Sequence, residues 1–323
     1  MRKTTKIWLV TAAFLVIVGL IIFTAVMWQY KWDFVKLDTE KYETNTYQIT
    51  EDFSHLSINT NTADIIFAFS YNGKCTVECY EEEKAKHSVS VVEDTLVINV
   101  IAKKSWYDYI GIHFGSPKIT VHLPKDQYVS LFIQETTGDI KLPKNFKFAD
   151  VDISLSTGNV DCFSSALGLL KIKTSTGDIC VENVSAKEID LSTSTGRISI
   201  SNAICTGTVN CSVFTGKTVL NGIACKTLTS NGDTGDISLN NVIVAEKFSI
   251  KRTTGDVKFD QSDAAEILTE TDTGDVIGNF LSEKIFIVES NSGRIVVPTS
   301  TTGGKCEIIT DTGDILVSKP LNK

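Results

Sequence analysis

Six aspartates beside one recurring glycine turn are the side chains in this sequence best suited to hold a metal ion. They form three pairs that each bracket a Thr-Gly dipeptide: Asp233 with Asp236, Asp272 with Asp275, and Asp311 with Asp314. Ca²⁺ prefers oxygen ligands, and stacked carboxylates repel one another unless a cation lies between them. The pattern therefore raises the hypothesis of a surface protein that is stabilised by a divalent cation.

A competing interpretation is that arginines neutralise these aspartates without a metal. In the sequence, Arg294 belongs to the turn between those of Asp275 and Asp314, and Arg252 lies just before the turn of Asp256. Several copies of the turn place Arg or Lys directly after the glycine, where a metal-binding column needs an acid. We therefore favour a salt-bridged edge over a calcium site and expect Ca²⁺ to change the stability little.

A second candidate site is an aromatic segment, KKSWYDYIGIHFG, at residues 103–115. Rings in a surface loop with basic flanks can bind a glycan, a protein or lipid headgroups. The alternative is that these rings fold back over the end of the core. The residues proposed for binding are Trp106, Tyr107, Tyr109, His113 and Phe114.

The cysteines and histidines indicate no catalytic or zinc site by their spacing. The eight cysteines match no zinc pattern, and the four histidines accompany no nucleophile motif. Cys205 and Cys225 lie nine residues after their turn glycines, so either a disulfide or a column of buried thiols fits them. We expect no cofactor. The net charge of −8 argues against nucleic acid, which selects basic surfaces.

A repeat of 19–20 residues must position most of these side chains. Apolar residues stand two and four places after most turn glycines, and seven and often five places before them, which is typical of strands with one buried face. So steady a period indicates stacked coils. We predict an all-β fold, a parallel β-solenoid of about ten coils with two short strands per coil. The turn glycines are Gly138, Gly158, Gly177, Gly196, Gly216, Gly235, Gly255, Gly274, Gly293 and Gly313.

The repeated turn is explained by structure rather than by chemistry. Glycine recurs where a chain must turn with positive φ. The Thr or Ser directly before each glycine suggests hydroxyl groups that bond between neighbouring coils. Asn183, Asn202 and Asn241, each six places after a glycine, predict an asparagine ladder at another turn.

The N-terminal segment predicts one transmembrane helix. Residues 7–28 carry no charge over 22 positions, which at about 1.5 Å per residue matches the hydrocarbon thickness of a bilayer. Neither a cleavable signal sequence nor a buried soluble helix fits this length as well. Arg2, Lys3 and Lys6 precede the span, so we expect the N-terminus in the cytoplasm and the body outside.

Residues between the anchor and the repeats are expected to form a stalk and the start of the solenoid. Residues 55–69 look like a degenerate coil, and VEDT at 92–95 predicts a hairpin turn. The predicted division is a cytoplasmic tail (1–6), a transmembrane anchor (7–28), a stalk (29–47), a β region that caps or starts the solenoid (48–130), solenoid repeats (131–318) and a tail (319–323).

The Thr-Ser-Thr-Gly-Asp-Ile coils, VHLPKD at 121–126 and the N-terminal anchor together resemble the putative-adhesin family of bacterial envelope proteins, a domain of unknown function with LiaG-like members. The resemblance covers roughly residues 50–318. It implies a non-enzymatic adhesive or stress-associated binding or scaffold role at the cell envelope. We expect the membrane as one partner and an envelope glycan or protein as another. The alternatives are a polysaccharide-active β-helix enzyme and the cation-stabilised surface protein.

Overall fold

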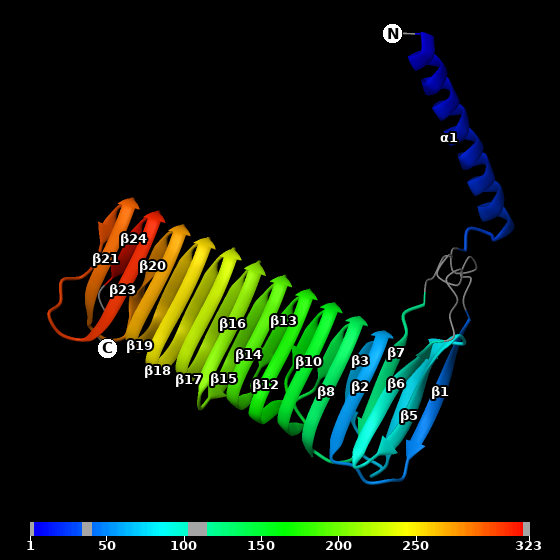
Figure 1. The fold of residues 1–323 in the computed structure, drawn as a ribbon, viewed down its shortest axis with the longest axis horizontal. Coiled ribbons are helices and arrows are strands. Elements are labelled where there is room, and N and C mark those ends of the chain that lie inside the picture. The colour runs from blue at the N-terminus through cyan, green and yellow to red at the C-terminus, as the bar shows by residue number, and fades with distance from the viewer. Residues whose placement is uncertain (1–2, 34–40, 103–114, 319–323) are drawn as a thin grey trace.

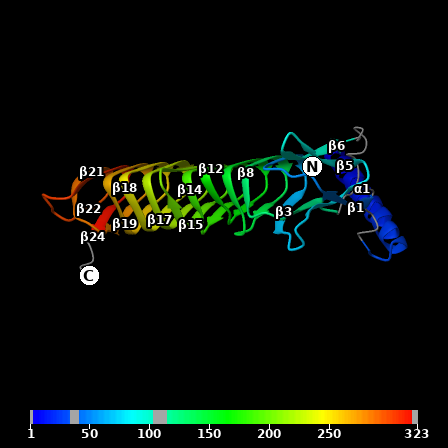
Figure 2. The same ribbon diagram turned by 90° about the horizontal axis from the view of Figure 1, so that it is seen from below.

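A computed structural model describes residues 3–33, 41–102 and 115–318 as one helix and a long stack of strands. Figure 1 shows the strands side by side in a row, with helix α1 (Lys3–Gln29) outside that row. The same row seen after a quarter turn is narrow, so the stack is an elongated rod (Figure 2). The predicted parallel β-solenoid after one N-terminal helix is confirmed.

Parallel pairing at a constant offset builds the middle of the rod. Paired residues of β12 and β14 are 19 or 20 positions apart in the sequence, for example Leu170 beside Ile189. The strands that lead up to the turn glycines are β8 (Gln127–Thr137), β10 (Lys147–Thr157), β12 (Ser165–Thr176), β14 (Ser185–Thr195) and β16 (Thr208–Thr215). Those that follow them are β9 (Ile140–Leu142), β11 (Val160–Cys162), β13 (Ile179–Glu182) and β15 (Ile198–Cys205).

Later coils are continuous strands that include one of the corners. They are β17 (Thr218–Thr234), β18 (Ile237–Thr254) and β19 (Val257–Thr273). Besides the two predicted strands, each of these coils has a short third paired segment, as where Ile223 and Ala224 pair with Val242 and Ile243. The corner before this segment interrupts the alternation of inward and outward side chains. The inward positions of the third segment therefore do not continue the period of two set by the preceding strand.

The core is a column of inward side chains that runs the length of the rod. In the coil after Gly196, the inward positions are filled by Ile198, Ile200, Ala203, Cys205, Val209, Cys211 and Val213, all buried. Burial of apolar surface at about 25 cal/mol per Å² is the main stabilising term, and every coil adds its share to one continuous cluster.

The N-terminal end changes from parallel to antiparallel pairing. β2 (His55–Thr62) and β3 (Asp64–Phe69) pair in parallel with β8 and β9, so residues 55–69 form the expected degenerate coil. Next come β6 (Thr95–Ala102) beside β2 and β7 (Lys118–Leu123) beside β3. β5 (Ala85–Val92) forms a hairpin with β6, with Glu93 and Asp94 at positive φ in the expected turn.

The second sheet ends in the same way. β4 (Cys75–Glu82) is antiparallel to β7, and β1 (Tyr42–Ile49) is antiparallel to β4. Residues 42–47, counted with the stalk in the sequence, thus lie within β1. β1 and β5 are the outer strands at this end.

The C-terminal end has an unexpected order. After β20 (Val276–Phe280), the chain forms β21 (Lys284–Ser292) and β22 (Ile295–Val296), then β23 (Gly304–Thr312) and β24 (Ile315–Ser318). β23 pairs with both β19 and β21, and β24 pairs with both β20 and β22. The last coil in sequence is therefore the second to last in space. Figure 1 shows β21 beyond β23 at the end of the row.

Candidate functional site

The turn glycines stack directly on one another along the rod. Nine of the ten have positive φ, from +125° to +156°; Gly293, in the outermost coil, is the exception. A Cβ atom on Gly196 would lie 2.1 Å from the carbonyl oxygen of Gly177. Both the conformation and the close approach of the next coil thus require glycine.

The hydroxyl groups that bond between coils are not those directly before the glycines. Those residues are exposed in all ten coils. Instead, in five of the ten coils a Thr or Ser three places before the glycine donates to the glycine carbonyl of an adjacent coil, as with Thr174 to Gly158 at 3.2 Å and Thr193 to Gly177 at 3.0 Å. The position next to the glycine points outward because side chains alternate along the strand, so the predicted position was wrong.

The residue after the glycine forms a ladder, in which a side-chain oxygen accepts the backbone N–H of the same position in the next coil. The first run begins as Asp139 N–H donates to Asp64 (3.0 Å) and ends as Arg197 N–H donates to Asp178 (2.7 Å). Arg197 and Lys217 carry no side-chain acceptor, so the run stops there. A second run links Asp236, Asp256, Asp275, Asp314 and Arg294.

Three of the six aspartates proposed as metal ligands belong to this second run. Oδ1 of Asp236 accepts from Asp256 N–H at 3.2 Å, and that of Asp275 accepts from Asp314 N–H at 2.8 Å. The other three stand two places before the glycine: Asp272 and Asp311 are exposed, and Asp233 is half-buried. The described part of the chain gathers no compact group of metal-capable side chains from these six.

The predicted place of Arg294 was wrong. Because the last two coils exchange places, Asp314 lies between Asp275 and Arg294, and the guanidinium reaches Asp314 alone at 3.1 Å. The backbone N–H of Arg294, followed by its guanidinium, holds the pKa of Asp314 below its usual value. Burial acts to raise the pKa of Asp236, but the N–H of Asp256 and the ammonium of Lys217 lower it further than burial raises it.

Arg252 also lies away from the edge where it was expected. It occupies the inward position three places before Gly255 and is 1% exposed. Its guanidinium donates to Thr218 Oγ1 at 2.9 Å and to Ser230 Oγ at 3.0 Å. Gly232 makes room for it, because a Cβ there would lie 1.9 Å from Nη1. Arg252 is a buried structural residue and cannot neutralise Asp256.

An open groove of about 590 Å³ runs beside the first ladder run, across five levels of the rod. Its floor is the outward face of β3, β9, β11, β13 and β15, with Ile66, Lys141, Asp161, Cys180 and Ser199 among the lining residues. One wall consists of the ladder residues Asp64, Asp139, Asn159, Asp178 and Arg197. Acids outnumber bases among the lining residues, so the groove suits an extended, polar or cationic ligand.

Two further sequence expectations concern the corner asparagines and the cysteines. Asn183, Asn202 and Asn241 have φ of 56°, 52° and 50°, and Asn202 Nδ2 donates to Asn183 Oδ1 at 3.3 Å, which confirms a ladder between these two. All eight cysteines are free thiols, Cys205 and Cys225 included. Of the two alternatives, the structure has the column of buried thiols.

The proposed aromatic site, Trp106, Tyr107, Tyr109, His113 and Phe114, lies outside the described residues. The first residue described after it is Gly115. Its carbonyl accepts a hydrogen bond from the Tyr42 hydroxyl at 3.2 Å, and the Tyr42 ring stacks on Tyr80 with centroids 5.3 Å apart.

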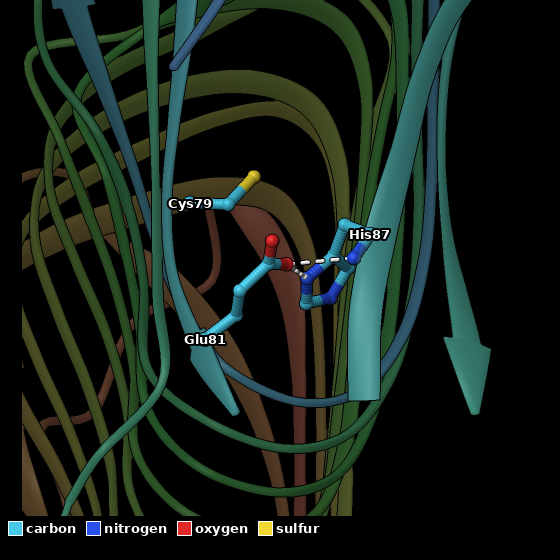
Figure 3. Close-up of side chains that lie close together, drawn as sticks. All are labelled: Cys79, Glu81 and His87. Atoms are coloured by element: carbon cyan, nitrogen blue, oxygen red, sulfur yellow. Dashed lines mark hydrogen bonds and ion pairs between the residues drawn. The ribbon is translucent and has the colours of Figure 1, made fainter. Parts of the chain in front are cut away.

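The sequence did not reveal a buried polar cluster near the N-terminal end of the rod. Cys79 and Glu81 point inward from β4, and His87 points toward them from β5 (Figure 3). One ligand atom from each residue lies within 4.8 Å of the other two. Inward alternation in CTVECYEE could have suggested Cys79 and Glu81. His87 lies only six residues after Glu81, but the sequence does not show that the turn between them leads into the other sheet.

This cluster has the hydrogen-bond order of a hydrolase triad but no access. Thr60 Oγ1 lies 2.8 Å from His87 Nε2, and His87 Nδ1 lies 2.7 Å from Glu81 Oε2. Thr60, His87 and Glu81 are 2%, 4% and 0% exposed, so no substrate carbonyl can reach the hydroxyl. The arrangement is therefore suited to holding the fold, or an ion, rather than to nucleophilic catalysis.

The chain is similar to solved structures from several bacteria. A protein described as a putative adhesin from Parabacteroides merdae is 13% identical over 87% of this chain and 98% of its own, with a TM-score of 0.47. A putative adhesin from Bacteroides fragilis is 14% identical over 86% and 97%, with a TM-score of 0.41. A putative lipid binding protein from Parabacteroides distasonis is 13% identical over 87% and 98%, with a TM-score of 0.45.

The family assignment rests on the sequence itself. No curated protein matches the chain. The family model described as Toastrack DUF4097 matches residues 53–213 and 207–322, which include strands β2 to β24, the turn glycines and the ladders described above. The chain belongs to the Toastrack DUF4097 family.

Proposed function

We infer that this protein is a membrane-anchored, non-enzymatic binding protein of the bacterial cell envelope, with its solenoid outside the cytoplasm. In this proposal residues 1–6 stay in the cytoplasm, residues 7–28 cross the membrane, and the β body binds an extended envelope polymer. The groove along five levels of the rod is the observation that carries the proposal.

The anchor is supported by the length and composition of α1. Residues Thr5–Gln29 are long and apolar enough to cross a bilayer, and almost all of their side chains are exposed. An apolar helix of this length in water would expose a large unfavourable surface, whereas lipid would cover it. Basic residues before the span favour a cytoplasmic N-terminus.

The shape of the groove supports a linear ligand. Stacked coils repeat at about 4.8 Å, so identical positions recur along the groove at a spacing close to the length of one sugar unit. Lys141, Asp161 and Ser199 point outward from its floor and offer hydrogen bonds at three of the five levels. A glycan or an extended peptide of the envelope has the matching shape.

The alternative of polysaccharide cleavage needs a carboxylic acid that donates a proton. The ladder aspartates in the groove wall are engaged differently: Asp139 accepts the N–H of Asn159 at 2.7 Å, and Asp178 accepts that of Arg197 at 2.7 Å. Both carboxyls are thus held by the ladder that links neighbouring coils. This favours binding without catalysis.

The test is binding of the purified full chain, held in detergent micelles, to isolated bacterial cell walls. Ser199→Trp places a large ring on the groove floor without changing the ladder. We expect it to weaken wall binding at least tenfold, on the order of 1.4 kcal/mol or more.

Ser238→Trp is the matched control, because Ser238 has the same half-buried outward position two coils further along and does not line the groove. Equal binding of both variants and wild type would show that the groove is not the binding surface. No wall binding by wild type would reject the proposed function as a whole.

A further inference from the structure

The buried cluster of Cys79, Glu81 and His87 has a geometry close to that of a metal site. Sulfur, oxygen and nitrogen atoms from the three side chains lie within 4.8 Å of one another. Tetrahedral zinc holds such ligand atoms roughly 3.3–3.8 Å apart, given bond lengths near 2.0–2.3 Å. Side-chain movements of about 1 Å would therefore suffice to bring all three onto one ion.

The three ligands come from opposite sides of the solenoid interior. β4 pairs with β1 and β7, whereas β5 pairs with β6, so the two strands belong to different sheets that face each other. Cys79 and Glu81 are two residues apart on the inward face of β4, and His87 faces them from β5 (Figure 3). An ion here would join the two sheets where the antiparallel cap begins.

The donor set is chemically selective. Thiolate, imidazole and carboxylate together suit zinc, whereas calcium and magnesium prefer oxygen alone. A divalent ion with one thiolate, one carboxylate and one neutral imidazole has no net charge. That balance matters here because an uncompensated buried charge is costly and the cluster is almost fully buried, with Cys79 and Glu81 both 0% exposed.

Neighbouring groups already orient two of the ligands. Asn45 Nδ2 donates to Glu81 Oε1 at 2.7 Å, which leaves Oε2 turned toward His87. Thr60 Oγ1 lies 2.8 Å from His87 Nε2, so Nε2–H can donate to this hydroxyl when Nδ1 holds a metal. Such an outer partner for the second ring nitrogen accompanies most metal-binding histidines.

The thiol of Cys79 takes no part in the hydrogen bonds that connect Glu81 and His87 to their neighbours. Glu81 and His87 bond to each other and to further residues, but no described residue hydrogen-bonds the Cys79 sulfur. A purely structural network of Glu81, His87, Thr60 and Asn45 needs no cysteine at this position. A metal ion would engage all three side chains.

We propose that Cys79, Glu81 and His87 bind one divalent transition-metal ion, with zinc as the ion that the donor set fits best. Binding releases the Cys79 thiol proton to solvent, and the His87 ring carries its remaining proton on Nε2. Three ligands from the chain leave one position of a tetrahedral ion for a water molecule or another small ligand. The ion would fasten β4 to β5 near the membrane-anchored end of the chain.

The test uses the purified full chain in detergent after removal of metals by a chelator. Titration with Zn²⁺ against a colorimetric competitor should give one equivalent bound per chain. Loading with Co²⁺ should give the intense near-ultraviolet band of a thiolate–cobalt bond. Cys79→Ser should abolish that band and weaken zinc binding about 100-fold. Loss of a residue that only hydrogen-bonds to a metal ligand costs at most about this much, so loss of a ligand itself should reach this value.

Cys75→Ser is the matched control, because Cys75 lies in the same strand and is also buried, and burial raises the pKa of both thiols to about 12. It should keep the band and the affinity. Retention of the band in Cys79→Ser, or its equal loss in both variants, would overturn the proposal. So would a wild-type chain that binds no zinc, a result that does not depend on how any variant folds.

Discussion

Glu135 shows how burial changes the chemistry of a single side chain in this core. It lies in β8, three places before Gly138 and 4% exposed. Oε1 accepts the N–H of Ala63 at 2.9 Å, and Oε2 has no partner among the described residues. Burial raises the pKa of Glu135 to about 8; the Ala63 N–H opposes this, and the charges of Asp64 and Asp139 add to it. The carboxyl is therefore mostly protonated at neutral pH.

This proton makes stability depend on pH. The folded pKa of Glu135 lies above its ordinary value of about 4.5, so the favourable contribution of Glu135 to stability is complete below about pH 4.5 and is lost as the pH rises through about 8. Glu135→Gln keeps an acceptor for Ala63 and cannot ionise. We predict that the stability advantage of Glu135→Gln over wild type grows by roughly 4 kcal/mol from pH 5 to pH 9. Urea unfolding at both pH values measures this, and an equal difference at both would contradict the assignment.

At the residue scale, the sequence predicted which residues form the turn, but it did not predict which charged side chains are buried. Asp in the turn was interpreted as structural, and the ladder of N–H to carboxylate bonds agrees with this. Arg252 was placed at the surface because arginine usually is. Its burial depends on Gly232 and Thr218, which are 20 and 34 residues earlier and become neighbours only when the coils stack.

At the scale of elements, the corner that holds the asparagine ladder depends on the backbone conformation of one residue in each coil. Five residues at this position have φ between 47° and 61°: Asn183, Asn202, Gly222, Asn241 and Gln261. Asparagine visits the left-handed region more easily than other non-glycine residues, whereas a β-branched residue there is strained. Gly222 thus interrupts a series that asparagine could continue.

Substitution at Gly222 tests this directly. We predict that Gly222→Asn changes the free energy of unfolding by no more than about 0.5 kcal/mol, because it adopts the same φ and lowers the entropy of the unfolded chain. Its Cβ would lie 3.0 Å from Asn202 Oδ1, a flexible side-chain end that can shift. Gly222→Val should cost about 1–2 kcal/mol. Similar losses for both in thermal unfolding would show that space, not backbone conformation, limits this corner.

At the element scale, strands that alternate strictly were predictable, and segments after a corner were not. Ile198 and Ile200 continue one period of two, but the corner at Asn202 shifts the phase, so that Ala203 and Cys205 face inward. The third paired segment was missed for this reason. Cys79, Glu81 and His87 lie within nine residues of one another, but they were missed because the sequence does not show that the turn at residues 83–84 carries the chain from one sheet to the other.

For the whole molecule, the glycine period predicted the rod but not the order of its last coils. A spacing of 20 residues from Gly293 to Gly313 looks the same whether the coils stack in sequence or exchange places. Lys284, which is 3% exposed, stabilises the exchanged positions of the last two coils. Its ammonium donates to the Ala264 carbonyl at 2.6 Å and forms an ion pair with Asp263. Lys284 pairs with Gly304, where a Cβ atom would lie 2.2 Å from the carbonyl oxygen of Ala265, so glycine at this position allows β23 to approach β19 closely.

Hydrogen exchange of the intact chain can distinguish the two orders. In the exchanged order β23 is covered on both sides, by β19 and β21, whereas among the described strands β21 pairs with β23 alone. We predict that amides of Gly304–Thr312 exchange slowly throughout the strand, as in the central β12 and β14. Amides of Lys284–Ser292 that point to the open edge should exchange much faster, because they lack a strand partner. Coils stacked in sequence order would give the opposite result, with β21 protected throughout and β23, nearer the chain terminus, at the exchanging edge.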